Sequence, residues 1–335
     1  MLSKPEKYLR GNYAIIWYNK ISNTLKVIVD PLGLKPIYLL EQEGCKYLSS
    51  SLWLLSKISK TLDYNSIAES IFFGYNITNK TIFKNIYQLE NSTELIIEND
   101  KINTNEYFSI IQFISTKPSK YSYEELRIIF NNVVLKRINE KNSEKDIIVT
   151  LTGGNDGRAV LSSVYYCGRN FKTFSFGMKN GENTLIPELI ANKLGFEHHS
   201  IYLEDSFIKE YFNNAIRTLI LSDGNLSFEQ QSTLYTFKKL KFFLSNSILL
   251  TGLLAGEILG PIHLKNDYFN EHYFNLVLNN EDLNENYLEI HDDLKIISKE
   301  FFKKHNDYLI HIINERKKQL SEIINQKQIS HLNYY

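Results

Sequence analysis

The stretch that most constrains this chain is a loop with two adjacent glycines, Leu151-Thr152-Gly153-Gly154-Asn155-Asp156-Gly157-Arg158. It follows the β-branched apolar run 147–150, which is typical of a buried strand, and it precedes 159–161, which can open a helix. Adjacent glycines let backbone N–H groups point inward, and the start of a helix adds unpaired N–H groups and the positive end of its dipole. The stretch therefore predicts a strand, a phosphate-binding loop and a helix, with Asp156 where a carboxylate could hold magnesium.

The spacing of the loop excludes two common phosphate motifs, because no Gly-Lys-Ser/Thr follows it and no G-x-G-x-x-G is present. It resembles the pyrophosphate loop S-G-G-x-D-S of the N-type ATP pyrophosphatases, in the form found in the asparagine synthetase family. Thr152 stands for the first Ser and keeps a hydroxyl, whereas Gly157 stands for the last Ser and lacks one. A glycine-rich turn without any ligand is the alternative that the loop alone leaves open.

Length and composition narrow the class of protein. A chain of 335 residues predicts about two domains, and a hydrophobic content of 43% is enough for ordinary cores. The 38 basic residues balance the 38 acidic ones, which argues against a nucleic-acid surface or an attraction to acidic membranes. No apolar run approaches the roughly 18 residues of a membrane helix. Two cysteines, Cys45 and Cys167, form no pairing framework, which favours a cytoplasmic protein.

The first hundred residues predict short strands joined by turns. The expected strands are 13–18, 24–29, 37–40 and 46–48, and they imply an antiparallel β-layer. A capped helix is expected over 63–73, and 95–102 predicts a hairpin with an Asn-Asp turn.

This region resembles the second half of the class II glutamine amidotransferase domain of asparagine synthetases. The matches include Gly11-Asn12-Tyr13-Ala14 for G-x-F-A and 30–38 for R-D-x-x-G-x-K-P-L-Y-Y. In that family the nucleophile is a Cys at the mature N-terminus, but here Met1 is followed by Leu2. Cys45 falls in a predicted hairpin turn with no base nearby, so it does not replace that nucleophile. We therefore expect residues 1–112 to form a partial amidotransferase-like domain without glutaminase activity, either a vestige or the remainder of a longer protein.

A helix over 124–138 introduces the second domain, expected over 122–335, after a polar linker at 115–122. Strand and helix signals then alternate, with strands expected at 171–177, 200–203 and 247–250 and helices at 185–194 and 207–220. Such alternation implies a mostly parallel sheet whose ligands lie at the carboxyl ends of the strands. The expected fold is thus an α+β amidotransferase-like β-layer followed by an α/β parallel-sheet ATP pyrophosphatase domain of the adenine nucleotide alpha hydrolase-like kind.

A second loop, 251–260, resembles the synthetases' S-G-x-G-A-D-E-L-F-G. Gly256 replaces the family Asp that helps to hold magnesium, and Glu257 remains. A shift of one position would let Glu257 serve the metal, and a solvated or salt-bridged Glu257 is the alternative. The resemblance also implies that Leu151, Phe176, Thr251 and Gly252 contact the nucleotide, largely through backbone atoms.

Two further features complete the prediction. The adjacent His198 and His199 point apart and lack ligands at metal spacing, so a surface or strand-edge role is expected for them. The stretch 308–327 is amphipathic and predicts a helix that packs on another element. The basic residue that stabilises the intermediate in family members has no evident counterpart.

The resemblance implies an ATP-dependent amide-forming ligase that uses ATP and Mg²⁺. Asp156 and Glu257 are its expected catalytic and metal-binding residues, and the loop residues listed above would hold the pyrophosphate. Its expected partners are a small-molecule carboxylate, with aspartate as the default, and ammonia or an amine; a homodimer is one assembly that the resemblance allows. Two alternatives stay open: a truncated, non-catalytic nucleotide-binding relative, and a ligase for another substrate of the β-lactam synthetase or lasso-peptide cyclase type.

Overall fold

A computed structural model describes residues 9, 11–109, 121–139, 145–253 and 298–327. The chain divides into two compact units, the first comprising Met1–Lys117 and Leu264–Tyr334 and the second Pro118–His263. Within the described residues, no helix is both long enough and apolar enough to cross a bilayer. The predicted linker at 115–122 falls mostly outside the described residues.

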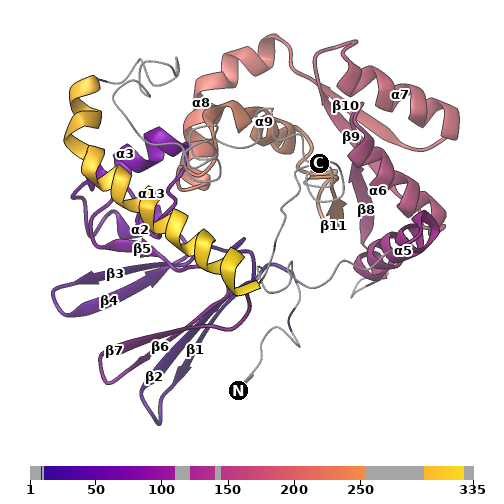
Figure 1. Cartoon of the computed structure of the whole chain (residues 1–335). Helices are drawn as coiled ribbons and strands as arrows, with labels where there is room; N and C mark the ends of the chain where they lie inside the picture. Colours follow the sequence, from indigo (N-terminus) through magenta and orange to yellow (C-terminus); the bar gives the residue numbers. More distant parts are fainter. Residues whose placement is uncertain (1–8, 10, 110–120, 140–144, 254–297, 328–335) are drawn as a thin grey trace. The chain divides into compact units, whose positions relative to one another are not determined.

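The first unit contains two antiparallel sheets (Figure 1). The four-stranded sheet has the order β1 (Ala14–Asn19), β2 (Thr24–Val29), β6 (Thr93–Glu98), β7 (Lys101–Glu106). The three-stranded sheet has the order β4 (Cys45–Ser49), β3 (Tyr38–Gln42), β5 (Ile86–Gln88). The predicted strands are confirmed, but the prediction of one antiparallel layer is incomplete, because β2 pairs with β6 rather than with β3.

A buried aspartate turns the chain from the first sheet into the second. The carboxylate of Asp30, only 1% exposed, accepts hydrogen bonds from the backbone N–H groups of Leu32, Leu34 and Lys35 at 3.0–3.2 Å. These bonds fix a turn that sends β3 away from β2. The two sheets then share one apolar core, formed by Val27, Val29 and Leu95 from one sheet and Ile37, Leu39 and Leu89 from the other side.

Local sequence signals set the turns and helix ends of this unit. Asn99 and Asp100 both take positive φ, at 48° and 61°, in the predicted tight hairpin between β6 and β7. Helix α2 spans Leu52–Leu55 and α3 spans Tyr64–Phe73. The Asp63 side chain caps α3 by accepting from the N–H groups of Asn65 and Ser66, and Gly74 ends the helix at φ 78°.

Helix α13 (Lys299–Lys327), yellow in Figure 1, packs on α3 in the first unit. Its buried stripe, Phe302, Leu309, Ile312 and Ile313, meets an apolar face that includes Phe72. The Tyr308 hydroxyl donates to the carboxylate of the fully buried Glu69 at 2.8 Å. The sequence predicted that this helix belongs to a second domain at 122–335. In the structure it contacts the first unit, because its apolar stripe packs on the apolar face of α3.

The second unit alternates strands and helices as predicted. Its elements in order are α5 (Tyr123–Asn139), β8 (Asp146–Thr150), α6 (Asn155–Tyr166), β9 (Lys172–Gly177), α7 (Glu182–Leu194), β10 (His198–Tyr202), α8 (Asp205–Leu221), η1 (Phe228–Gln230), α9 (Gln231–Lys239) and β11 (Ser247–Leu250). Each pair of neighbouring strands is parallel, in the order β10-β9-β8-β11. The parallel sheet is therefore confirmed, while η1 and α9 were missed.

The two faces of this sheet pack on different helices. Ile147, Val149 and Leu151 point to one face, where they meet buried residues of α5 and α6 such as Ile138 and Val164. On the other face Ile148 and Phe174 meet Leu240, which directly follows α9. Burial on both faces explains why β8 reads as a continuous apolar run rather than an alternating one.

Candidate functional site

The strand order places a topological switch between β8 and β11. The chain moves from β8 to β9 to β10 in one direction and then returns to the far side of β8 with β11. In open parallel sheets, ligands bind at the carboxyl ends of the strands where the order reverses. The two loops singled out in the sequence, at 151–158 and 251–252, follow these two strands.

The first residue of the first loop, Leu151, is held in place at the end of β8. Leu151 is fully buried, and its N–H donates to the Phe174 carbonyl at 2.9 Å. The N–H of Gly154 donates to the Thr152 hydroxyl at 3.2 Å, which closes the loop. Helix α6 then begins after Gly154, whose backbone is extended and which offers no side chain to cap the helix. The N–H groups of the first helical turn therefore face outward without an intrahelical acceptor.

A second helix start lies against this loop. Helix α7 also begins after a glycine, Gly181, without a side-chain cap. The N–H of Gly153 is 3.4 Å from Oδ1 of Asn183, and a Cβ on Gly153 would lie 3.1 Å from the Glu182 carbonyl oxygen. Asn183 was not predicted, because nothing in its sequence position indicates that the start of α7 meets the loop after β8.

The two predicted loops are in direct contact. A Cβ built on Gly252 would lie 2.5 Å from the Asp156 carbonyl carbon and 2.6 Å from the Gly157 nitrogen. No side chain fits at such distances, so Gly252 allows the loop after β11 to close on the first turn of α6. Thr251, which is exposed, turns beside it, with the N–H of Leu253 3.4 Å from its hydroxyl. Sequence spacing could not show this contact, since the two segments are about a hundred residues apart.

Gly157 is buried because the start of α6 packs closely on the end of β8. A Cβ at this position would lie 3.1 Å from the Thr150 carbonyl oxygen. The hydroxyl that the pyrophosphate loop resemblance leads one to expect here is thus replaced by tight packing of helix on strand. The loop still presents the hydroxyl of Thr152 on its other side.

The charged residues of the loop differ in their contacts. Nε of Arg158 donates to the Gly154 carbonyl at 3.1 Å and its guanidinium also contacts Asn155, so this exposed side chain folds back over the helix start. The half-buried Asp156 has no ion-pair or hydrogen-bond partner for its carboxylate among the described residues. Glu257, its predicted companion, lies outside those residues, and within them no group of three potential metal ligands occurs.

Phe176 lies on β9, two residues beyond Phe174, the strand partner of Thr150. Its side chain packs at the edge of the cluster formed by Ile148, Phe174 and Leu240. The ring therefore faces away from α6, and the backbone of Phe176 is what reaches the carboxyl edge of the sheet beside the loop.

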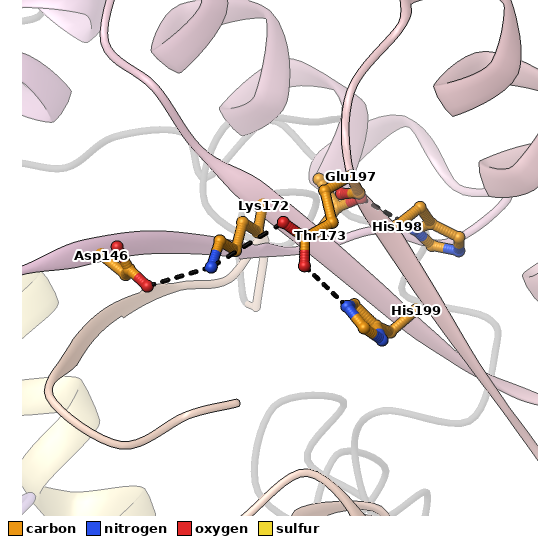
Figure 2. A network of polar contacts seen from close by, with 6 residues as sticks. All are labelled: Asp146, Lys172, Thr173, Glu197, His198 and His199. Atoms are coloured by element: carbon orange, nitrogen blue, oxygen red, sulfur yellow. Dashed lines mark hydrogen bonds and ion pairs between the residues drawn. The ribbon is translucent and has the colours of Figure 1, made fainter. Parts of the chain in front are cut away.

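His198 and His199 occupy opposite faces of β10, which is an edge strand of the sheet (Figure 2). His198 contacts the Thr173 hydroxyl through Nδ1 at 2.8 Å and the Ser175 hydroxyl through Nε2 at 3.1 Å. The Thr173 hydroxyl also lies 3.2 Å from the Glu197 carbonyl oxygen. Burial lowers the pKa of His198, which keeps the ring neutral. The pair acts as part of the strand edge.

A carboxylate completes the polar layer between β10 and α7. Glu188 accepts hydrogen bonds from the Ser200 and Tyr202 hydroxyls at 2.6 and 2.7 Å, and these bonds lower the pKa of Glu188. This layer fixes α7 on the sheet and thereby the position of its first turn beside the loop.

Cys45, the cysteine of the amidotransferase-like region, is exposed and begins β4. The turn itself is Glu43–Gly44, with positive φ at both residues, so the prediction that Cys45 lies within the turn was wrong by one position.

Comparison with known proteins assigns the first region. Residues 4–108 match the model of the glutamine amidotransferase domain family. Residues 4–108 therefore form a glutamine amidotransferase-like domain. The glutamine-hydrolysing asparagine synthetase of Mesocricetus auratus is 33% identical over 82 residues, which cover 23% of this chain and 14% of that protein.

A second relative extends further along the chain. A putative glutamine-hydrolysing asparagine synthetase of Methanocaldococcus jannaschii is 23% identical over 215 residues, 61% of this chain. The chain is related to the asparagine synthetases. It spans 41% of the length of that relative, less than half.

Among solved structures, an NH₃-dependent NAD synthetase from Campylobacter jejuni aligns with 14% identity over 61% of this chain and 96% of its own, with a TM-score of 0.28. A glutamine-dependent NAD⁺ synthetase from Acinetobacter baumannii aligns with 11% identity over 79% and 66%, with a TM-score of 0.29. Both scores are too low to establish a shared fold.

Proposed function

We propose that this chain is an ATP-dependent amide-forming ligase. In the proposed reaction a substrate carboxylate attacks the α-phosphate of ATP and releases pyrophosphate, and ammonia or an amine then displaces AMP from the acyl-adenylate. The observation that carries the proposal is the contact between Gly252 and Asp156 at the switch point of the sheet, where both resembling loops meet. The relation to asparagine synthetases supports the same class of reaction.

The residues present fit a nucleotide triphosphate. The uncapped first turn of α6 supplies N–H donors suited to the charge that develops on leaving pyrophosphate, and we propose that the loop of Gly153 and Gly154 lies against the same phosphates. Mg²⁺ is proposed at Asp156, with Glu257 as a second ligand, since magnesium commonly takes one or two carboxylates beside water and phosphate oxygens. Leu151, Phe176 and Thr251 would contact the nucleoside through backbone atoms.

The substrates follow only from chemical class. Aspartate is the default carboxylate, because the curated relatives are asparagine synthetases. We further propose that Cys45 is not the nucleophile of a glutaminase, because it begins a strand in the middle of the domain. The amine would then be free ammonia or an amine-bearing substrate, as in the β-lactam synthetase type.

The test is carboxylate-dependent exchange of labelled pyrophosphate into ATP, measured with Mg²⁺ and a panel of acids that includes aspartate. We expect exchange with at least one acid and its loss in Asp156→Ala. Asp205→Ala is the matched control, since Asp205 lies in the first turn of α8, after a different strand. Exchange that survives Asp156→Ala unchanged would contradict the metal assignment, and absence of exchange with every acid would contradict the ligase.

A second candidate is a nucleotide-binding relative without turnover. The buried Gly157 favours it, because the loop lacks a hydroxyl that the ATP pyrophosphatases carry at this position. Calorimetric titration with ATP and Mg²⁺ separates the two: binding without exchange supports this candidate, whereas binding with exchange supports the ligase.

A further inference from the structure

A hollow lies at the opposite edge of the parallel sheet from the loops described above. It has a volume of about 660 Å³, within the usual range for small-molecule pockets. It is bounded by the amino ends of β8 and β9 and by the ends of α6 and α7. The lining residues that matter are Asp146, Tyr165, Arg169, Phe171, Lys172, Leu194, Phe196 and Glu197. Since β9 has six residues, this hollow is about 17 Å from the carboxyl edge.

The floor of the hollow is aromatic. The ring of Phe171 lies 5.1 Å from that of Phe196 and 6.4 Å from that of Tyr165, measured between centroids. Phe171 and Phe196 pack on the core below them, whereas Tyr165 is 56% exposed and Leu194 is 49% exposed. A flat apolar group that covers this floor would remove apolar surface from water on both sides and form ring contacts.

One side of the rim favours a positive charge. Lys172 lies between two carboxylates, with its Nζ 3.2 Å from Asp146 and 3.8 Å from Glu197 (Figure 2). A single ammonium thus faces two carboxylates, and the second of them, Glu197, also contacts Nε2 of His199 at 2.9 Å. The negative ends of the α6 and α7 dipoles also reach this rim, because both helices end here. A Cβ on Gly168 or Gly195 would meet no atom within 4 Å, so the helix ends are open to a ligand.

The lining of the hollow also includes a guanidinium. Nη1 of Arg169 donates to the Asn139 side chain at 2.8 Å, and Arg169 has no carboxylate partner among the described residues. Its remaining N–H groups form the fork that matches a carboxylate. The hollow therefore presents an anion-binding group and a cation-binding group together with an aromatic floor.

We propose that this hollow binds a free α-amino acid with an aromatic side chain. The ligand's carboxylate pairs with Arg169, its ammonium with Glu197 and the end of α7, and its ring covers Tyr165, Phe171 and Phe196. The inference is independent of the proposed ligase activity, because none of its residues lies at the carboxyl edge of the sheet.

The test is isothermal titration of the full chain with L-phenylalanine and three probes that each lack one element. Phenethylamine lacks the carboxylate, 3-phenylpropionate lacks the ammonium and L-alanine lacks the ring. We expect L-phenylalanine to bind at least ten-fold more tightly than each probe, since each probe loses either a charge-assisted hydrogen bond or the contacts of the ring. Equal affinity for L-phenylalanine and phenethylamine would overturn the role of Arg169, and no heat with millimolar L-phenylalanine would overturn the site.

Exposed side chains supply variants that should keep the fold. Tyr165→Ala should weaken L-phenylalanine binding several-fold, whereas Tyr166→Ala, on the same helix but outside the hollow, should not. Arg169→Gln should bring the affinities for L-phenylalanine and phenethylamine together, with Arg217→Gln on α8 as its control. A loss that is equal in variant and control would show that binding occurs elsewhere and would contradict the proposal.

Discussion

Asp156 of the second unit differs from the two buried carboxylates of the first unit, and also from Glu188 of its own unit, which accepts two hydrogen bonds. In the first unit the buried Asp30 and Glu69 are saturated: Asp30 accepts three backbone N–H groups, and Glu69 accepts from Thr78 and Tyr308. In the second unit Asp156, at the carboxyl edge of the sheet, has no such partner among the described residues. The difference separates carboxylates that hold a fold from one that we propose binds a ligand, because a buried charge must be paired whereas a binding site needs a carboxylate without a protein partner.

The largest effect on the stability of the first unit is expected at α13, the helix that carries the hydrogen bond to Glu69. Leu309, which is 1% exposed, packs in its apolar stripe, so Leu309→Ala should lower the free energy of unfolding of the first unit by about 3 kcal/mol. Both tryptophans of the chain, Trp17 and Trp53, lie in this unit, so urea unfolding followed by tryptophan fluorescence reports on it alone. The exposed His311→Ala is the control. A loss of stability seen only in hydrogen exchange of the second unit would contradict the assignment of α13.

Removing one hydrogen-bond donor to Glu69 tests whether the full set of hydrogen bonds at this carboxylate stabilises the first unit. Tyr308→Phe deletes a 2.8 Å hydrogen bond to a fully buried carboxylate and should cost about 2 kcal/mol in the same fluorescence assay. Burial and then the contact with Glu69 raise the pKa of Tyr308, so its phenol should also resist ionisation at alkaline pH in ultraviolet titration. Tyr64→Phe, at an exposed position on α3, should leave stability unchanged; an equal loss in both variants would refute the role of Glu69.

The second unit should respond to acid through His198. Burial lowers the pKa of this histidine below its ordinary value of 6.5, so the unfolded chain takes up a proton that the folded chain resists. Stability from this group is present above about pH 6.5 and is lost as the pH falls through that value toward the lower pKa of the folded state. We expect the urea concentration at the unfolding midpoint to decrease when the pH of the urea solution is lowered from 7.5 to 5.5. The midpoint is measured on peptides from β9 and β10 by pulsed hydrogen exchange, with the labelling pulse always at one pH.

The matched pair of histidines sharpens that measurement. His198→Gln should reduce the decrease of the urea midpoint on acidification, because it removes the ring that lies between Thr173 and Ser175. His199→Gln changes a ring on the opposite face of the same strand, and its urea midpoint should decrease as much as that of the unchanged protein. A decrease of the same size in all three proteins would mean that groups other than His198 cause the acid response.

The smallest effect on stability is expected at the candidate site itself. Asp156→Ala should change the free energy of unfolding by no more than about 0.5 kcal/mol, since Asp156 lies in the first turn of α6 and its carboxylate has no partner among the described residues. The same variant should abolish Mg²⁺-dependent stabilisation by ATP in thermal unfolding. A large loss of stability without nucleotide would show that Asp156, like Asp30 and Glu69, belongs to the fold.

The sequence by itself determined the elements and their type. Apolar alternation and turn residues such as Asn99–Asp100 located the antiparallel strands, and the alternation of strands with helices implied the parallel sheet, because these signals depend on neighbours along the chain. The glycine loop at 151–158 was also visible, since its conformation is set locally. Helix α9 was missed because its buried face is partly polar, with Gln231, Tyr235 and Thr236 in place of an apolar stripe.

Only the tertiary structure decided which segments meet. It assigned α13 to the first unit, split the expected β-layer into two sheets, and placed Gly252 against Asp156 at distances that no other residue allows. It also brought the ends of α6 and α7 together around the aromatic hollow. Such contacts depend on the complementarity of surfaces that are distant in sequence. A local sequence pattern shows that a segment has an apolar face but not which distant segment packs against that face.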